Sequence, residues 1–228
     1  MSESAFHVLI PRPRPEAEET ARAVEARGWR PIVSPLVEIE PVAPDGPRRA
    51  DPPPEADALV VTSPRAVAHA PAAMLDVPAY VVGERTAGEW RARGGRVVAT
   101  APDGARLVAS VRAARGRLVH LCGREIAFDF AAALPDADLR RMVVYEARPV
   151  PLSEAARDAL AAGHASALLT SPRIAALLGR EGTTVRALAL SEAVAARWRA
   201  CGGTAEVAAR PTMAALLELL GDAPSRQP

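Results

Sequence analysis

The amino-acid sequence predicts an α/β protein with two parallel sheets, and an internal repeat is the main evidence. Thr62-Ser63-Pro64-Arg65 recurs as Thr170-Ser171-Pro172-Arg173, an offset of 108 positions. The same offset aligns further residues: Glu84 with Glu192, Trp90-Arg91-Ala92 with Trp198-Arg199-Ala200, and Gly94-Gly95 with Gly202-Gly203. The chain has only 3 Trp residues, so composition does not explain two that align. A constant offset of this kind indicates a duplicated unit.

Each copy of the repeat has the same local pattern. The apolar runs Ala58-Leu59-Val60-Val61 and Ala167-Leu168-Leu169 precede the two Ser-Pro pairs. Short apolar runs are typical of buried strands. Ser before Pro is typical of a helix start, because Ser caps free amides and Pro fits the first helical position. Strand, turn and helix together form half of a βαβ unit, which predicts parallel sheets flanked by helices.

Before the first copy, we expect a strand over 6–10, a helix over 16–27 that stops at Gly28, and a strand at 32–33. Segment 35–42 alternates charged and apolar residues, which suits an extended crossing between domains. Segment 43–54 is dense in Pro, so we expect a loop or linker there.

From the first copy onward, strands and helices alternate. Strands are expected at 58–62, 79–82, 96–99, 117–121, 142–146, 167–170, 185–190 and 205–208. A second crossing is predicted at 147–151, since Pro interrupts that segment, and the tail after Gly221 is expected to be disordered.

The strand count predicts the domains. The middle segment supplies five predicted strands, and the outer segments together supply another five. We therefore expect two flavodoxin-like domains with parallel five-stranded sheets, joined by a two-stranded linker. The inserted domain spans 39–149, and the discontinuous domain combines 1–38 with 150–228. In such folds ligands bind at the carboxyl ends of the strands, so we expect a cleft there.

The composition argues against several classes of function. The net charge of +1 argues against a nucleic-acid-binding surface. The sequence has no uncharged apolar run long enough to span a membrane, and its first residues do not resemble a signal peptide. Cys122 and Cys201 lack metal-ligand spacing, so we expect buried free thiols, a cytoplasmic location and no metal site. All 28 basic residues are Arg, which excludes Schiff-base lysine chemistry and leaves Arg as the fixed cation for carboxylates.

Predicted helix starts are the remaining candidates for a binding site. Five of them carry a hydroxyl residue that capping alone would explain: Ser63, Thr86, Ser171, Ser191 and Thr212. Together their free amides and hydroxyls would suit a polyanionic ligand. Arg12 follows the first strand and Arg124 follows Cys122-Gly123, so both are candidate cation partners, although a solvated surface role is the default for an Arg. Tyr145 ends a predicted strand beside the second crossing, where it is either a packed rim residue or a hydroxyl aimed into the cleft.

An ordered set of motifs resembles the uroporphyrinogen-III synthase family. The set comprises Val8-Leu9-Ile10-Pro11-Arg12-Pro13, Ser34-Pro35-Leu36, Thr62-Ser63-Pro64-Arg65-Ala66-Val67, Val82-Gly83 with Thr86-Ala87, Val144-Tyr145 and Arg210-Pro211-Thr212. The family more often has Thr where this chain has Pro11. The resemblance covers nearly the whole chain and implies two flavodoxin-like domains joined by a two-stranded ladder.

The resemblance also implies an activity: closure of hydroxymethylbilane to uroporphyrinogen III, without a cofactor, with inversion of ring D and loss of water. By matching position, Tyr145 would donate a proton to the departing hydroxyl, as a helpful but dispensable weak acid. Thr62, Ser63, Gly83, Thr86, Ser171, Ser191 and Thr212 would hold carboxylates, of which the linear tetrapyrrole substrate has eight, with Arg12 and Arg124 as cation partners. We expect a monomer that receives its substrate from the preceding bilane-forming enzyme.

Two alternatives follow from other classes of protein. A two-domain binding or regulatory module would close on a small anionic ligand without chemistry, because fold alone does not establish activity. A response-regulator-like domain is disfavoured, because such a domain has clustered Asp residues at its first strand end, where this chain has Pro11 and Arg12.

Overall fold

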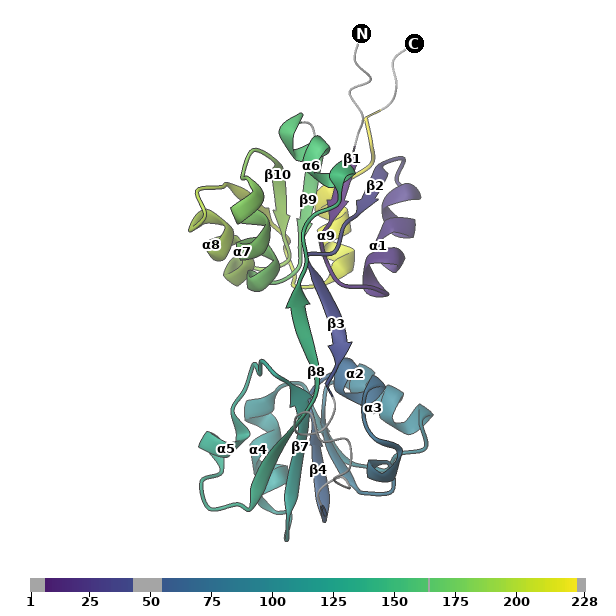
Figure 1. Cartoon of the computed structure of the whole chain (residues 1–228), viewed down its shortest axis with the longest axis vertical. Coiled ribbons are helices and arrows are strands. Elements are labelled where there is room, and N and C mark those ends of the chain that lie inside the picture. The colour runs from purple at the N-terminus through teal and green to yellow at the C-terminus, as the bar shows by residue number, and fades with distance from the viewer. Residues whose placement is uncertain (1–6, 43–54, 164, 225–228) are drawn as a thin grey trace. The chain divides into compact units, whose positions relative to one another are not determined.

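The computed structural model describes residues 7–42, 55–163 and 165–224. It has α-helices and two largely parallel sheets, as predicted (Figure 1). Position 6 of the first expected strand and the expected linker 43–54 lie outside the described residues. None of the helices in the described ranges is long and apolar enough to cross a membrane.

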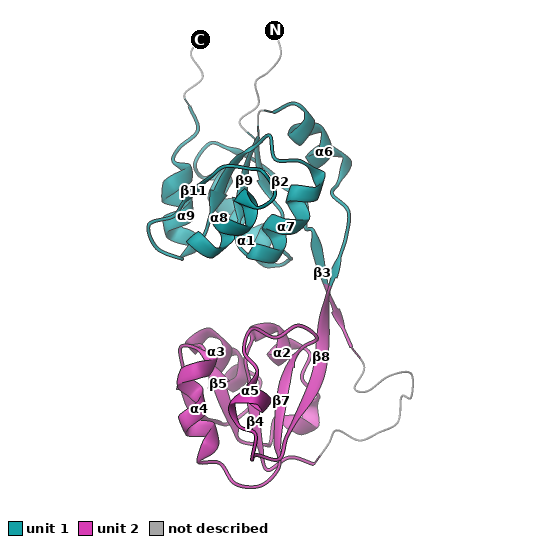
Figure 2. Ribbon diagram, turned by 90° about the vertical axis from the view of Figure 1, so that its left-hand side faces the viewer, with its two compact units in different colours: residues 1–38, 148–228 teal, residues 39–147 magenta. Residues whose placement is uncertain are grey.

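The chain divides into two compact units, which Figure 2 colours separately. Unit 1 combines residues 1–38 and 148–228, and unit 2 spans 39–147. The strands β3 (Val37–Pro41) and β8 (Leu139–Pro149) both pass from one unit to the other. They are hydrogen-bonded neighbours in the sheet of unit 2, where the amide of Val42 also donates to the carbonyl of Val144.

Unit 1 contains a sheet with the spatial order β11-β10-β9-β1-β2, and all four neighbouring pairs are parallel. Its elements are β1 (His7–Ile10), α1 (Glu16–Glu25), β2 (Arg30–Val33), α6 (Glu154–Ala161), β9 (Ala165–Leu169), α7 (Pro172–Glu181), β10 (Arg186–Ala189), α8 (Glu192–Arg199), β11 (Ala205–Val207) and α9 (Met213–Leu220).

Unit 2 contains a sheet with the spatial order β3-β8-β7-β4-β5-β6, in which β8 to β6 are parallel. Its further elements are β4 (Ala58–Val61), α2 (Pro64–Ala68), the 3₁₀-helix η1 (Ala72–Met74), β5 (Ala79–Val82), α3 (Glu84–Ala92), β6 (Val97–Ala101), α4 (Gly104–Arg112), β7 (Leu118–Gly123) and α5 (Phe130–Ala133). This sheet has six strands instead of the predicted five. The reason is that β8 is much longer than the predicted 142–146, so the crossing strand β3 pairs with it.

The repeat relates the two sheets. Strands β4, β5 and β6 of the first copy correspond to β9, β10 and β11 of the second, and each trio is extended by two more strands in the same spatial order. In unit 2 the two added strands are β7 and β8, which come last along the chain. In unit 1 they are β1 and β2, which come first. Numbered along the chain, unit 1 therefore has the flavodoxin-like order 2-1-3-4-5, and unit 2 has the order 3-2-1-4-5 for the corresponding five strands. The flavodoxin-like order expected for both units is found in unit 1 alone.

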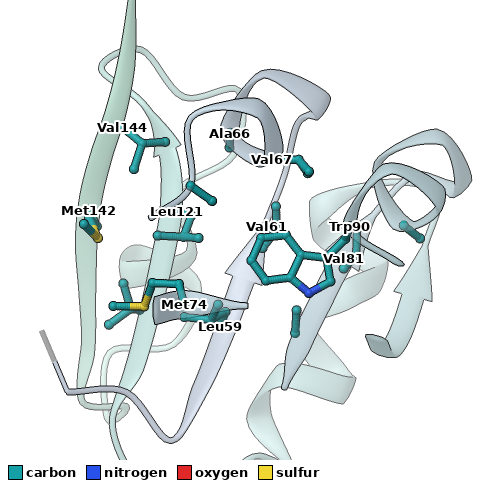
Figure 3. Close-up of a cluster of buried hydrophobic side chains, with 14 residues drawn as sticks. Leu59, Val61, Ala66, Val67, Met74, Val81, Trp90, Leu121, Met142 and Val144 are labelled. Carbon is teal, nitrogen blue, oxygen red and sulfur yellow. The ribbon is translucent and has the colours of Figure 1, made fainter. Parts of the chain in front are cut away.

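Both faces of the unit 2 sheet are buried, as expected for a parallel sheet. Along β4, Leu59 and Val61 contribute to one apolar cluster, while Ala58 and Val60 contribute to another on the opposite face. This alternation follows from the two-residue period of a strand. Figure 3 shows the first cluster, where Trp90 of α3 lies beside Val61 and Val81. The sheet is thereby fixed beneath the strand ends that form the candidate site.

Candidate functional site

A cavity of about 200 Å³ lies in unit 2 where parallel strands end. It is lined by Thr62, Ser63, Val82, Gly104, Cys122, Gly123, Glu125, Ile126, Ala127, Phe128 and Tyr145. The lining includes the ends of β5 and β7 and the residues that follow β4, so the cavity lies at the carboxyl edge of the sheet. Ligands of open α/β sheets bind at this edge. The structure thus brings three predicted site residues together: Thr62, Ser63 and Tyr145.

The hydroxyl groups of Ser63 and Tyr145 are in direct contact. Their oxygens lie 3.1 Å apart, and either group can be the donor. Ser63 is also the N-cap of α2, where its Oγ accepts a hydrogen bond of 3.1 Å from the amide of Ala66. The Tyr145 ring lies 6.2 Å from the ring of His69. The phenol is therefore held at the cavity by its own strand, β8, and by its contact with the capped start of α2.

Gly123 makes room for the phenol. The register between β7 and β8 shifts after Cys122, so that Gly123 pairs with Tyr145. A Cβ on Gly123 would lie 2.7 Å from Cζ and 2.9 Å from the hydroxyl oxygen of Tyr145. Bulges of this kind re-aim side chains near functional sites. The bulge and the missing side chain together place the Tyr145 ring across the end of β7.

Thr62 contacts a buried histidine that the sequence analysis did not select. The Oγ1 of Thr62 lies 3.2 Å from Nε2 of His120, a residue of β7 that is 1% exposed. Burial is the main cause that lowers the pKa of His120 to about 4, and Arg141 lowers it further, while Asp129 opposes the shift. His120 is thus neutral near pH 7 and can hold Thr62 without adding charge. The only signal for it in the sequence is the presence of a His inside an apolar strand.

Arg141 is a second residue that sequence reasoning missed. It projects from β8, and its Nη2 donates to the carbonyl of Arg124 at 3.0 Å and lies 3.4 Å from that of Gly123. It also lies near the thiol of Cys122. Burial raises the pKa of this thiol, and Arg141 opposes part of that shift. Arg141 therefore fixes the turn that follows β7 and places a positive charge beside Cys122, which lines the cavity.

Arg124 is already paired. Its Nε donates to Oε2 of Glu146 at 2.7 Å, with side chains that are 61% and 24% exposed. Arg124 directly follows β7, which ends at Gly123, two residues beyond the predicted end at 121. A substrate carboxylate at Arg124 would have to compete with Glu146. Such exposed pairs are weak, so this competition is feasible.

The prediction that Thr86 is an N-cap is wrong. Helix α3 begins at Glu84, and its N-cap is Gly83, with a φ of +85°. Glycine adopts this conformation without steric cost, so the chain can turn into the helix before it reaches Thr86. Thr86 lies inside the first turn and is only 3% exposed. Gly83 therefore occupies the helix start that was assigned to Thr86.

The remaining predicted site residues belong to unit 1. Ser171 and Thr212 are the N-caps of α7 and α9, and their hydroxyl oxygens accept from Ile174 and Ala215 at 3.2 Å. Ser191 is the N-cap of α8, but its side chain makes no capping hydrogen bond. Arg12 follows β1 and donates from Nη1 to the Thr20 hydroxyl of α1 at 3.1 Å.

A larger hollow of about 540 Å³ lies in unit 2 at the start of β7 and β8. Its lining comes from 111–118 and 134–138 and includes none of the predicted site residues. Of the two cysteines, Cys122 is buried and Cys201 is partly exposed. Both are free thiols, so the expectation of burial was wrong for Cys201. Within the described ranges, no group of three or more His, Cys, Asp and Glu side chains could hold a metal ion.

Comparison with known proteins identifies the family. The sequence of residues 18–218 matches the family described as uroporphyrinogen-III synthase HemD. The chain belongs to the uroporphyrinogen-III synthase family. Members of this family are cyclising lyases of tetrapyrrole biosynthesis, which makes a small-molecule tetrapyrrole the substrate of this synthase.

Solved structures agree with the fold. The uroporphyrinogen-III synthetase from Helicobacter pylori aligns with a TM-score of 0.68 and 20% identity, covering 94% of this chain and 97% of its own. A mutant uroporphyrinogen III synthase from the extremely thermophilic bacterium Thermus thermophilus aligns with a TM-score of 0.57 and 17% identity, covering 94% and 96%. No curated protein matches this synthase in sequence. At these identities the structural likeness shows the fold, and the roles of individual residues must be argued from the site.

Proposed function

We propose that this synthase closes hydroxymethylbilane to uroporphyrinogen III, inverting ring D, and that Tyr145 is its proton donor. The observation that supports this role is the position of the phenol at the cavity wall, within 3.1 Å of the Ser63 hydroxyl. In this proposal, helix starts of the duplicated units bind the eight substrate carboxylates. The reaction requires no cofactor in this scheme.

The proton donor acts in the first step. As the carbon–oxygen bond of the terminal hydroxymethyl group breaks, Tyr145 gives its proton to the oxygen, which leaves as water with the bonding electrons. The substrate becomes an azafulvenium cation and Tyr145 becomes a phenolate. Ring closure through a spiro intermediate then turns ring D over. The proton released when the ring system is restored returns to the phenolate, so that one water is lost overall. Because the uncatalysed closure gives the I isomer, the protein mainly controls conformation.

The carboxylate ligands are assigned by their positions. In unit 2 we assign Thr62, Gly83 and Thr86, with Arg124 as a cation, and in unit 1 Ser171, Ser191 and Thr212, with Arg12. Helix starts favour anions through their free amides. At Thr86 the group assigned to a carboxylate is the backbone amide, because the side chain is buried within the first turn of α3. For Ser63, the first helix turn is also a poor anion site, since α2 has only 5 residues.

An isomer assay tests the proposed reaction. Fresh hydroxymethylbilane is given to the purified protein, and the oxidised products are separated into uroporphyrins I and III. We expect isomer III to predominate. We expect Tyr145→Phe to slow turnover by up to about a hundredfold while isomer III remains the product. Tyr80→Phe is the matched control, because it removes the other phenol of the chain from β5. Wild-type turnover in Tyr145→Phe would contradict the proton-donor role, and isomer I alone would favour a binding module.

We also propose that the synthase works as a cytoplasmic monomer that receives its labile substrate from the preceding bilane-forming enzyme. The two free thiols support a reducing compartment. Size-exclusion chromatography with light scattering, with and without the bilane-forming enzyme, would test the monomer and the transfer partner. A stable dimer of the synthase would contradict the first point.

A further inference from the structure

Ser63 has one hydrogen atom that its capping role does not use. A serine hydroxyl offers one donor and two acceptor lone pairs. Its oxygen accepts from the amide of Ala66 at 3.1 Å, which occupies one lone pair. The remaining neighbour is the phenol oxygen of Tyr145, also at 3.1 Å. The proton of Ser63 and one lone pair are therefore available for the contact with Tyr145.

The contact can be made in two ways, and only one is compatible with proton donation. If Tyr145 donates to Ser63, its proton is engaged by the Ser63 oxygen and is not available to the substrate. If Ser63 donates to Tyr145, the phenol proton is free to point into the cavity. Once Tyr145 has lost its proton, only the second arrangement remains, because a phenolate has no hydrogen to donate.

We propose that Ser63 is a positioning residue that donates its hydrogen bond to the phenol oxygen of Tyr145 and stabilises the phenolate formed during the first step. This inference rests on the proposed function of Tyr145. It changes the expected role of Ser63, because a hydroxyl engaged with Ala66 and Tyr145 has little capacity left for a substrate carboxylate. Ser63 then acts on the reaction through Tyr145.

The hydrogen bond from Ser63 to the phenol oxygen of Tyr145 strengthens as negative charge develops on that oxygen. Hydrogen bonds to an ionised oxygen are roughly twice as strong as those between neutral groups. An interaction that is stronger in the transition state than in the ground state raises kcat instead of lowering KM. The donor is also fixed in advance, since the cap holds Ser63 and the β7–β8 bulge holds the ring of Tyr145.

Several other titratable and charged groups lie near the phenol of Tyr145. The His69 ring, the Glu125 side chain in the cavity lining and the Cys122 thiol are the neighbouring titratable groups. The Arg124–Glu146 pair adjoins Tyr145 along the chain and across the strand end, and Arg141 holds the turn that follows Gly123. All of these remain in place in a Ser63 variant, so a difference between variants reports on Ser63.

The duplicated unit supplies a matched control. Ser171 caps α7 as Ser63 caps α2, with an oxygen that accepts from Ile174 at 3.2 Å. In unit 1 the strand that corresponds to β8 is β2, Arg30–Val33, which carries no tyrosine. Ser171→Ala therefore removes the same kind of cap without changing the surroundings of a phenol.

The first test is a kinetic double-mutant cycle. We expect Ser63→Ala to lower kcat about tenfold, the size expected for a lost hydrogen bond to a charged group, with little change in KM. Ser63→Thr should restore kcat, and Ser63→Gly, which preserves the helix start, should behave like Ser63→Ala. In a Tyr145→Phe background, Ser63→Ala should have no further effect, because the two residues act as one unit. A raised KM with unchanged kcat, or an equal loss of kcat in both backgrounds, would overturn the proposal.

The second test does not depend on catalysis. In a Tyr80→Phe background, Tyr145 is the only tyrosine, so its conversion to phenolate is followed by ultraviolet absorbance as pH rises. We expect Ser63→Ala and Ser63→Gly to move the titration midpoint to higher pH, and Ser63→Thr and Ser171→Ala to leave it unchanged. An unchanged midpoint in Ser63→Ala would overturn the role of Ser63 even if the isomer assay succeeds. Conversely, wild-type turnover in Tyr145→Phe would remove the proton-donor role and leave this measured coupling intact.

Discussion

A Cβ atom on Gly123 would lie 2.7 Å from Cζ of Tyr145, so the proposed catalytic ring occupies space that only glycine leaves open. The two residues are paired across β7 and β8 just after the register shift at Cys122. The position of the phenol therefore depends on backbone geometry as much as on its own side chain. A change at Gly123 should act on Tyr145 without touching the phenol itself.

We predict that Gly123→Ala lowers kcat at least as strongly as Tyr145→Phe, because the added methyl group displaces the whole ring. Overpacking of this kind also destabilises a fold by about 1–3 kcal/mol. The measurement is turnover together with urea unfolding. Gly88→Ala is the control, since Gly88 lies inside α3 and the added Cβ would have no atom within 4 Å beyond its chain neighbours and its own helix backbone. Normal turnover in Gly123→Ala would show that the ring position is not needed.

A second prediction concerns the two aligned tryptophans. Trp90 and Trp198 are fully buried, and in each copy a Cβ on the glycine five residues later, Gly95 or Gly203, would lie 2.2 Å from the indole nitrogen. We expect Gly95→Ala and Gly203→Ala each to destabilise the unit that contains it by about 3 kcal/mol, since the indole cannot move within a packed core. Near-ultraviolet circular dichroism and tryptophan fluorescence would report the displaced rings. A native spectrum in either variant would contradict the duplicated packing.

A third prediction concerns pH. Burial lowers the pKa of His120 from 6.5 to about 4, so between these values the unfolded chain binds a proton that the folded chain does not. The free energy of unfolding should therefore fall as the pH drops from about 6.5 to 4, with a loss of about 2 kcal/mol from this group at pH 5. His120→Gln removes this contribution. Urea unfolding at about pH 7.5 and about pH 5 should show a smaller decrease for His120→Gln than for wild type, and equal decreases would exclude a buried neutral His120.

Much of the fold was predictable because local patterns determine it. The apolar runs that lead into Ser63-Pro64 and Ser171-Pro172 are buried strands followed by capped helices, as predicted. The repeat offset also identified the Trp and Gly positions that pack alike in both units. Periodicity could not show that β3 joins the sheet beside β8, because pairing between distant strands depends on tertiary structure.

The candidate site was less predictable, for a physical reason. Sequence position placed Thr62, Ser63 and Tyr145 near strand ends. These three residues line one cavity, although β8 continues past Tyr145 to Pro149. Partners such as His120, Arg141 and Glu146 come from strand positions whose neighbours are set by register, which the sequence does not reveal. Thr86 failed as a cap because Gly83, with its positive φ, starts the helix three residues earlier. The binding of substrate by these residues stays a prediction.

The last prediction concerns the charge near the site. Arg124 is engaged by Glu146 at 2.7 Å, and a substrate carboxylate must compete with this partner. Glu146→Gln removes the competing charge but keeps a side chain of similar shape, so we expect KM for hydroxymethylbilane to fall by about two- to fivefold, in line with the small energy of an exposed pair. Arg124→Gln should raise KM, and the double variant should resemble Arg124→Gln alone, because Glu146 acts through Arg124.

The pair Arg85–Glu89 on α3 is a control of the same exposed type, and Glu89→Gln should leave KM unchanged. The effect should shrink as salt is added, since screening weakens exposed charges. A fall in KM that persists in the Arg124→Gln background would show that Glu146 acts on the substrate directly, and an unchanged KM in Arg124→Gln would remove Arg124 from the set of carboxylate ligands.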